Sequence, residues 1–157
     1  MVSLKQIEKK NKKLLENLMQ LYLHDISLYF PVDINSNTCK YVYDDLDKYF
    51  DSSDNNAYLF MDGDNVIGFT LINKEDNNMV VQEMFILNNY KNKKLGELSI
   101  SKIFDKYKGN WVIRSLPCSP KSESFWNKTI GNYTNNKYSV EHIGKYNRAV
   151  FKFNNKE

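Results

Sequence analysis

One stretch of the chain, residues 80–105, constrains the fold more than any other because it joins a strand, a basic loop and a helix. Residues 80–87 are mostly apolar, residues 88–97 carry three lysines and one glycine, Gly96, and residues 98–105 repeat apolar side chains at helical spacing. Such a loop directs the free backbone N–H groups of the first helical turn, and the positive end of the helix dipole, toward one point. The stretch therefore predicts a phosphate site, which the lysines reinforce.

The basic loop resembles the acyl-CoA pyrophosphate loop of the GNAT superfamily of N-acyltransferases. In that family the pattern is Gln/Arg-x-x-Gly-x-Gly/Ala, and residues 91–96 meet it here as Lys-Asn-Lys-Lys-Leu-Gly. Lys91 stands where Gln or Arg is usual, and Lys94 replaces the first glycine. We expect Lys94 to be tolerated if its backbone keeps a negative φ, because only a positive φ demands glycine.

The resemblance continues on both sides of the loop and covers residues 14–153. Residues 57–72 are similar to the family's central hairpin, whose second strand begins with a Gly-Phe pair. Residues 109–117 and 124–128 are similar to a bacterial subgroup of predicted acetyltransferases. The resemblance implies the GNAT fold, in which the strand before the phosphate loop parts from the strand after the helix, and the pantetheine arm of CoA lies between them.

Periodicity and turn residues predict the element order α-α-β-β-β-α-β-α-β-β. Apolar side chains at three- and four-residue steps predict a long first helix over residues 3–23, with Ser3 as its N-cap. The other expected elements are a helix over 43–50, a hairpin around 62–65, a strand over 80–87, a helix over 95–107, a strand over 111–116, a helix over 122–130, and a closing hairpin of 138–143 and 148–153. This order predicts an α/β (α+β) protein with a mixed, mostly antiparallel sheet flanked by helices.

Length and charge restrict the classes of function. A chain of 157 residues has the length of one domain, which we expect to span residues 1–157. The net charge of +3 comes from 22 Lys and Arg residues against 19 acidic ones, and only two of the basic residues are arginine. A nucleic-acid-binding domain usually concentrates more positive charge, often as arginine, so we expect no nucleic-acid partner.

Apolar runs, cysteines and histidines complete these restrictions. No run approaches the ~20 apolar residues that cross a bilayer, and no secretory signal is apparent, so we expect no membrane partner. Cys39 and Cys118 lie far apart, and His24 and His142 are isolated, so neither a disulfide framework nor a metal site is expected. The cytoplasm is the simplest location for such a chain.

Glu83 is the first candidate for catalysis because it lies inside an apolar strand, where a carboxylate is costly to bury without a partner or a function. The resemblance implies that an acidic side chain on this strand acts as the general base, since the free amine and not the ammonium attacks a thioester. The alternative is a strand carboxylate that faces solvent or pairs with a lysine.

Trp126 occupies the position where many family members carry a tyrosine that protonates the departing CoA thiolate. An indole N–H cannot act as an acid at neutral pH, so either the thiolate leaves unassisted or another group such as Tyr133 takes this task. We expect Phe125 to pack in the core and Trp126 to line the CoA site. Ser119 stands where the family often has an asparagine that touches CoA.

The resemblance thus implies Glu83 and Tyr133 as catalytic residues, with a cofactor-binding set in the strand, the loop and the two helices that follow. That set is Phe85, Ile86, Leu87, Lys91, Asn92, Lys93, Lys94, Leu95, Gly96, Glu97, Ser119 and Trp126. The end of the first helix walls the acceptor site in this fold, which makes Tyr22, Asp25 and Tyr29 candidates for acceptor binding. Ordinary surface positions are the alternative for these three residues.

The predicted function is an N-acetyltransferase that moves an acetyl group from acetyl-CoA to a primary amine of a small molecule or peptide. Direct attack in a ternary complex is expected because no motif for a covalent acyl-enzyme is present, and no metal is required. Two alternatives stay open: a GNAT-fold module that binds acyl-CoA with little turnover, suggested by Lys94 and Trp126, and a small basic RNA-binding protein, suggested by the lysines alone. Monomer and homodimer are both compatible with the sequence.

Overall fold

The structure, a computed structural model, describes residues 1–44 and 46–156. Its elements in chain order are β1 (Val2–Gln6), the 3-10 helix η1 (Lys9–Asn11), α1 (Lys12–Ile26), β2 (Ile34–Asn35), β3 (Lys40–Tyr41), α2 (Lys48–Asp51), β4 (Asn55–Asp62), β5 (Asn65–Glu75), β6 (Asn78–Ile86), the 3-10 helix η2 (Asn88–Tyr90), α3 (Leu95–Lys106), β7 (Asn110–Arg114), α4 (Pro120–Thr134), β8 (Ser139–Ile143) and β9 (Arg148–Asn154). Within the described ranges, no helix is long and apolar enough to cross a membrane.

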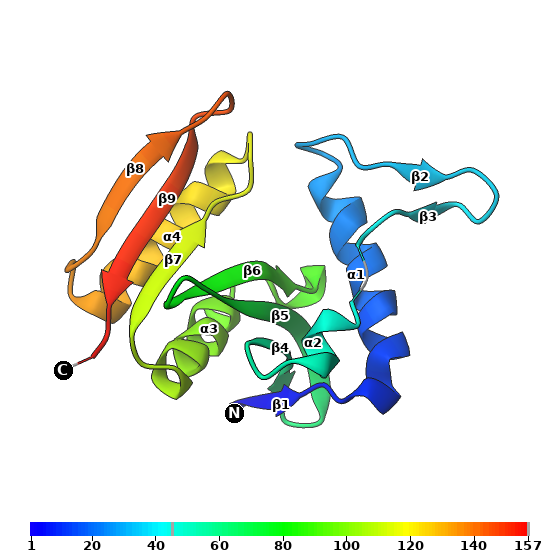
Figure 1. The fold of residues 1–157 in the computed structure, drawn as a ribbon, viewed down its shortest axis with the longest axis horizontal. Helices are drawn as coiled ribbons and strands as arrows, with labels where there is room; N and C mark the ends of the chain where they lie inside the picture. Colours follow the sequence, from blue (N-terminus) through cyan, green and yellow to red (C-terminus); the bar gives the residue numbers. More distant parts are fainter. Residues whose placement is uncertain (45, 157) are drawn as a thin grey trace.

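Seven strands form one sheet in the order β1-β4-β5-β6-β7-β9-β8, with β6 and β7 parallel and every other neighbouring pair antiparallel. Helices α1 and α2 cover one face of this sheet, which we call the α1 face, and α3 and α4 cover the other, the α3 face (Figure 1). The predicted mixed, mostly antiparallel sheet with flanking helices is confirmed.

Each face of the sheet has its own apolar core because strand side chains alternate between the two faces. The core on the α3 face contains Phe104, Trp111 and Phe153, whose rings pack edge-on or stacked. The core on the α1 face includes Leu15 from α1 and Phe69 from β5, both fully buried. That core contains no residue of β7, β8 or β9 among the described residues, so this part of the α1 face lies beyond the cover of α1.

Strands β6 and β7 pair over only part of their length. The pairing runs from Asn78 opposite Asn110 to Val81 opposite Ile113, and beyond it the strands part, as Figure 1 shows. A bulge lies at the parting point: in the β5–β6 pair, Leu71 is opposite Glu83 but Ile72 is opposite Val81, which leaves Gln82 as an extra residue. Bulges bend a strand and increase its twist, so β6 turns away from β7 here.

The parting leaves one edge of β6 free between residues 83 and 86. These residues pair with β5 on one side and have no strand on the other. Alternate backbone N–H and C=O groups along this edge therefore lack a ladder partner, and a ligand with amide groups can satisfy them.

The start of the chain differs from the prediction. Residues 2–6 form β1, antiparallel to β4 with Leu4 opposite Phe60, so the predicted helix from Ser3 to residue 23 is wrong in its first part. The helix α1 begins only at Lys12. Two patterns overlap in this short stretch. The alternation from Val2 to Leu4 predicts a strand, whereas the three-residue step from Leu4 to Ile7 predicts a helix. Residues 2–6 form a strand because they can pair with β4 at the edge of the sheet.

Candidate active site

Glu83 lies on β6 directly after the bulge and faces the α1 side of the sheet, as its partner Leu71 does. The Tyr43 hydroxyl donates a hydrogen bond of 3.1 Å to Oε1, and the Tyr22 hydroxyl donates one to Oε2. Burial raises the pKa of the Glu83 carboxyl, while the two tyrosines and the positive charge of Arg148 oppose this shift. Glu83 is thus a fixed carboxylate that takes up a proton more readily than an exposed one.

The two tyrosines come from different segments and hold the carboxylate in one orientation. Tyr22 is buried on α1, where its ring packs edge-on against Phe69 and tilted against Phe85. Tyr43 lies in the segment between β3 and α2. Burial and the charge of Glu83 raise the pKa of both phenols, so both stay protonated donors. Sequence reasoning selected Tyr22 but missed Tyr43.

Two arginines lie on the same face, across the parting from Glu83. Arg148 begins β9, and its Nε donates a hydrogen bond to the carbonyl of Ser115. Burial lowers the pKa of Arg148, nearby Arg114 lowers it further, and Glu83 raises it. Sequence reasoning gave neither arginine a role, although their scarcity among the basic residues was an available signal.

The basic loop leads into the amino terminus of α3, whose first turn is free of a side-chain cap. Lys94 is the N-cap, and no side-chain hydrogen bond caps the helix. The N–H groups of residues 95–97 therefore lack an intrahelical partner. A Cβ on Gly96 would lie 3.3 Å from the Ile86 side chain and 3.4 Å from the Phe125 ring, so this glycine brings α3 close to β6 and α4.

Lys94 has a left-handed backbone, with φ 60° and ψ 2°, so the condition of a negative φ is not met. Asn92 also has a positive φ, of 61°. The loop between η2 and α3 turns here through a left-handed conformation, which glycine adopts without steric cost. A non-glycine residue pays about 1–2 kcal/mol for it.

We expect Lys94→Gly to raise the stability of the protein by about 1 kcal/mol, because it relieves this strain at a modest entropic cost. The melting temperature should then rise by roughly 2–4 °C, measured by calorimetry. Lys93→Gly is the matched control, since Lys93 is not among the positive-φ residues and its substitution should give no gain. Equal effects of the two substitutions would show that Lys94 carries no strain.

The loop lysines have different environments. Lys91 Nζ lies 2.7 Å from Asp25 Oδ2 and 5.7 Å from the centroid of the Phe85 ring. Asp25, predicted to bind the acceptor, therefore ties α1 to the loop. Lys93 lies over the ring of Tyr90, while Lys94 and Asn92 are exposed at the loop surface.

The other predicted positions lie close to the loop or take structural roles. The side chains of Phe85 and Ile86 are buried in opposite cores, while the Leu87 N–H donates to the Ile67 carbonyl at 2.8 Å. Leu95 and Glu97 lie in the first turn of α3, where Glu97 accepts a hydrogen bond from Asn132. Tyr29 is half-exposed in the turn after α1, and its hydroxyl makes no hydrogen bond to the described residues.

The structure does not bring Tyr133 to this site. Its hydroxyl donates to Asp105 Oδ1 at 2.9 Å, near the end of α3. Its ring packs with Phe104 and Phe153 against the core of the α3 face. Glu83 faces the α1 side, so Tyr133 and Glu83 lie on opposite faces of the sheet.

On α4, Trp126 is more deeply buried than its neighbour Phe125. Trp126 is 6% exposed and packs in the core, whereas Phe125 is only partly buried and lies against Gly96. Ser119 is buried as the N-cap of α4, and its Oγ accepts the Ser122 N–H at 3.2 Å. A serine directly before a proline is a typical helix start, so this cap was readable from the sequence.

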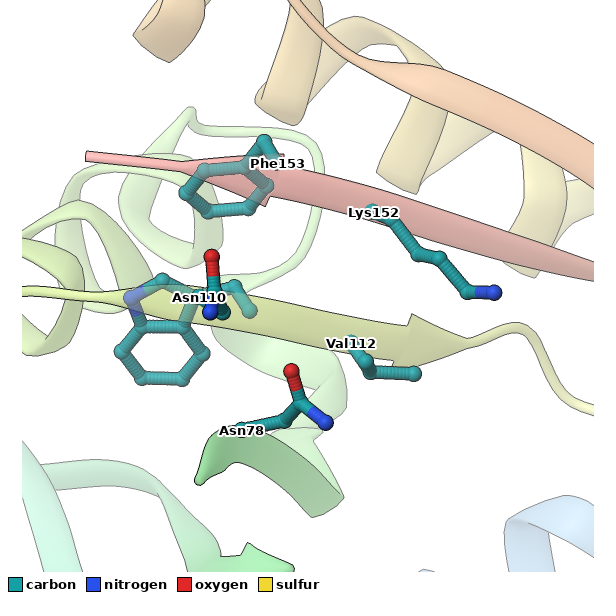
Figure 2. A pocket seen from close by; sticks show the side chains of 6 residues that line it. Asn78, Asn110, Val112, Lys152 and Phe153 are labelled. Carbon is teal, nitrogen blue, oxygen red and sulfur yellow. The ribbon is translucent and has the colours of Figure 1, made fainter. Parts of the chain in front are cut away.

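One hollow of the surface is lined by Tyr43, a hydrogen-bond partner of Glu83, together with Met19 and Gln20 of α1. Another, shown in Figure 2, has a volume of about 230 Å³ and lies at the amino-terminal ends of β6 and β7, lined by Asn78, Asn110, Trp111, Val112, Lys152 and Phe153. It borders the paired part of the two strands, whereas Glu83 lies where they have parted. The described residues contain no group of three His, Cys, Asp or Glu side chains that could hold a metal ion.

Solved structures share this architecture over the whole chain. An acetyltransferase from Thermus thermophilus matches with a TM-score of 0.74 at 14% identity, over 99% of this chain and 97% of that one. An acetyltransferase of the GNAT family from Staphylococcus aureus matches with a TM-score of 0.66 at 12% identity, over 99% of this chain and 100% of that one. The chain has the GNAT fold. A Bacillus subtilis acetyltransferase solved with CoA matches with a TM-score of 0.60 at 13% identity, over 99% and 100% of the two chains. No protein-family model and no curated protein matches the sequence.

Proposed function

We propose that this GNAT-fold protein is an N-acetyltransferase that moves an acetyl group from acetyl-CoA to a primary amine. The observation that carries the proposal is the position of Glu83, a carboxylate of raised pKa held by two tyrosines where β6 parts from β7. A general base is the group that amine acetylation needs, because the acceptor is an ammonium ion in water and must lose a proton before it attacks.

The chain has groups that suit the pyrophosphate and the pantetheine arm of acetyl-CoA. The uncapped N–H groups of residues 95–97, with Lys93 and Lys94 beside them, suit the pyrophosphate. The free edge of β6 between residues 83 and 86 suits the amides of the pantetheine arm. An arm that follows this edge leads from the phosphate loop toward Glu83.

Acetyl-CoA supplies an activated thioester carbonyl, and residues of the chain remove the proton from the acceptor ammonium. Glu83 accepts the proton of the acceptor ammonium at a carboxylate oxygen, while Tyr22 and Tyr43 keep that carboxylate oriented. The amine nitrogen then forms a bond to the acetyl carbon, the carbon–sulfur bond breaks, and the nitrogen releases its second proton to the departing thiolate through solvent. A thiolate is a good leaving group, and Tyr133 is remote, so we assign no residue of this chain to its protonation.

Binding of CoA should raise the melting temperature. A ligand at a hundred times its Kd adds about 2.7 kcal/mol to the free energy of unfolding, which corresponds to several degrees for a chain of this size. The double charge reversal Lys93→Glu with Lys94→Glu should reduce the shift, measured by differential scanning fluorimetry. Lys102→Glu, an exposed position further along α3, is the control and should leave the shift unchanged.

Absence of any shift at millimolar CoA would contradict the proposal. A shift without release of CoA thiol in the presence of a broad panel of amines would identify a CoA-binding module in place of an enzyme. Thiol release that depends on an amine would establish turnover.

A further inference from the structure

The two arginines of the chain are neighbours on the sheet, although 34 positions separate them in the sequence. Arg114 ends β7 opposite Val150, and Arg148 lies two residues before Val150 on β9. Positions related in this way are diagonal neighbours on one face, close enough for long side chains to meet. This face is the α1 face, because the alternate residues Ile113 and Phe151 point into the core of the α3 face.

The positive charge of this arginine pair, Arg114 and Arg148, is poorly compensated. The only carboxylate within ion-pair distance of Arg114 among the described residues is that of Glu75, at 3.8 Å, and both side chains are partly exposed. Arg148 makes no ion pair with a described residue, and its one hydrogen bond uses Nε on a neutral carbonyl. Two neighbouring guanidinium groups are costly to hold partly buried without an anion.

The same face carries further buried polar groups close to Glu83. The Tyr49 hydroxyl and the Asn73 side chain are buried there and act on each other, and the charge of Glu83 also acts on Tyr49. Asn73 is opposite Val80 on β6, two residues from Glu75, the partner of Arg114. The sheet face beside Glu83 is therefore lined by polar groups, which suits a polar ligand.

We propose, building on the acetyltransferase function above, that the acceptor is an amine that also carries an anionic group, a carboxylate or a phosphate. Its ammonium faces Glu83, and its anionic group is held by Arg114 and Arg148. The forked guanidinium is suited to both anions, because it binds two oxygens at once. The site is then complementary to an acceptor with both charges, as in an amino acid or a small amino-phosphate.

The test uses matched pairs of amines that differ only in the anionic group. Each amino acid is compared with its carboxamide, and phosphoethanolamine and glucosamine 6-phosphate are compared with ethanolamine and glucosamine. We measure CoA thiol release with acetyl-CoA, and the melting temperature with CoA and each amine. For at least one pair, the anionic member should have a kcat/KM roughly 10- to 100-fold higher, the range expected for hydrogen bonds to a charged group. It should also raise the melting temperature of the CoA complex further than its partner.

Substitutions of the arginines should remove this preference. Arg114→Met should lower the anionic-to-neutral ratio of kcat/KM toward one, and Arg148→Met should do the same, while Arg148→Lys should restore part of it. Lys152→Met is the control, because Lys152 is on the same face of β9 but exposed and paired with Glu141. A loss of rate for both members of a pair, with an unchanged ratio, would show that Arg148 only tunes Glu83 and would overturn the proposal.

The outcomes distinguish a failure of the anionic-acceptor proposal from a failure of the proposed acetyltransferase function. Efficient turnover of neutral amines with no preference in any pair would overturn the anionic acceptor and leave the acetyltransferase intact. A response confined to the amino acids or to the phosphates would support the proposal and identify the anion. A melting shift with CoA but none with any amine, and no thiol release, would overturn both.

Discussion

Glu83→Gln should lower the rate of acetyl transfer by roughly 10²- to 10³-fold, in line with the usual contribution of a general base. The amide keeps the shape of the side chain and still accepts hydrogen bonds from Tyr22 and Tyr43, but it cannot take a proton. Affinity for CoA should stay near that of the wild type, because the phosphate loop is unchanged. The measurement is kcat and KM for amine and acetyl-CoA in both proteins.

The pH dependence gives the decisive signature. Glu83 acts as a base only when it is ionised, and burial raises its pKa, so the wild-type rate should rise with pH through one apparent pKa above the ordinary value of a glutamate. This limb should be absent in Glu83→Gln. Glu141→Gln on β8 is the control, since that carboxylate is exposed. An active Glu83→Gln enzyme with the wild-type pH profile would show that solvent or another residue takes the proton.

Stability has the opposite pH dependence at this residue. Because the pKa of Glu83 is raised on folding, the folded protein holds this proton over a pH range in which the unfolded chain has released it. The contribution of Glu83 to the free energy of unfolding is therefore full below the unfolded pKa and falls as the pH rises through the folded one. The same raised pKa that favours proton transfer lowers stability at neutral pH.

Gly68→Ala should be the most damaging single-atom change in the sheet. A Cβ at this position on β5 would lie 2.0 Å from the carbonyl oxygen of Phe85 and 3.0 Å from its carbon. The backbone of β6 would have to move, and overpacking of this kind costs typically 1–3 kcal/mol and occasionally more. We expect a loss of about 3 kcal/mol in urea unfolding. Affinity for CoA should fall as well, because the Phe85 peptide belongs to the free edge of β6.

Gly63→Ala in the same hairpin is the matched control for this prediction. Gly63 has a φ of +58°, and a Cβ there would meet nothing within 4 Å, so only the cost of a left-handed backbone, about 1–2 kcal/mol, applies. Gly68→Ala could instead lower the free energy of unfolding no more than Gly63→Ala does and leave CoA binding normal. This result would show that the Phe85 carbonyl is free to move and that its close approach to Gly68 does not matter for CoA binding.

The sequence predicted those elements whose structure depends on neighbouring residues in the chain. The central hairpin, α3 and the closing hairpin follow from periodicity and turn residues, and the predicted ranges agree with the structure to within a few residues. The strand β1 could not be found in this way, because its partner β4 lies more than 50 residues away and its own pattern is too short to separate helix from strand.

The candidate site was predictable to a similar degree. The cost of a carboxylate in an apolar strand was enough to select Glu83. Its partners Tyr43 and Arg148 come from segments that only the folded sheet brings together. Tyr133 was chosen for its chemistry alone, and nothing in the sequence shows that α4 carries it to the opposite end of α3. The backbone of Lys94 depends on how tightly the loop must turn, which a side-chain pattern does not reveal.

The bulge at Gln82 decides on which side of the sheet Glu83 lies. Along a regular strand, odd and even positions keep their faces, so Val81 and Glu83 would point the same way. Val81 points into the core of the α3 face, and the extra residue reverses the parity from there on, which turns Glu83 and Phe85 toward the α1 face. In a regular β6 the carboxylate of Glu83 would share the α3 face with Val81, on the opposite side of the sheet from Tyr22 and Tyr43. One unpaired residue thus does as much to specify a base at this position as the glutamate itself.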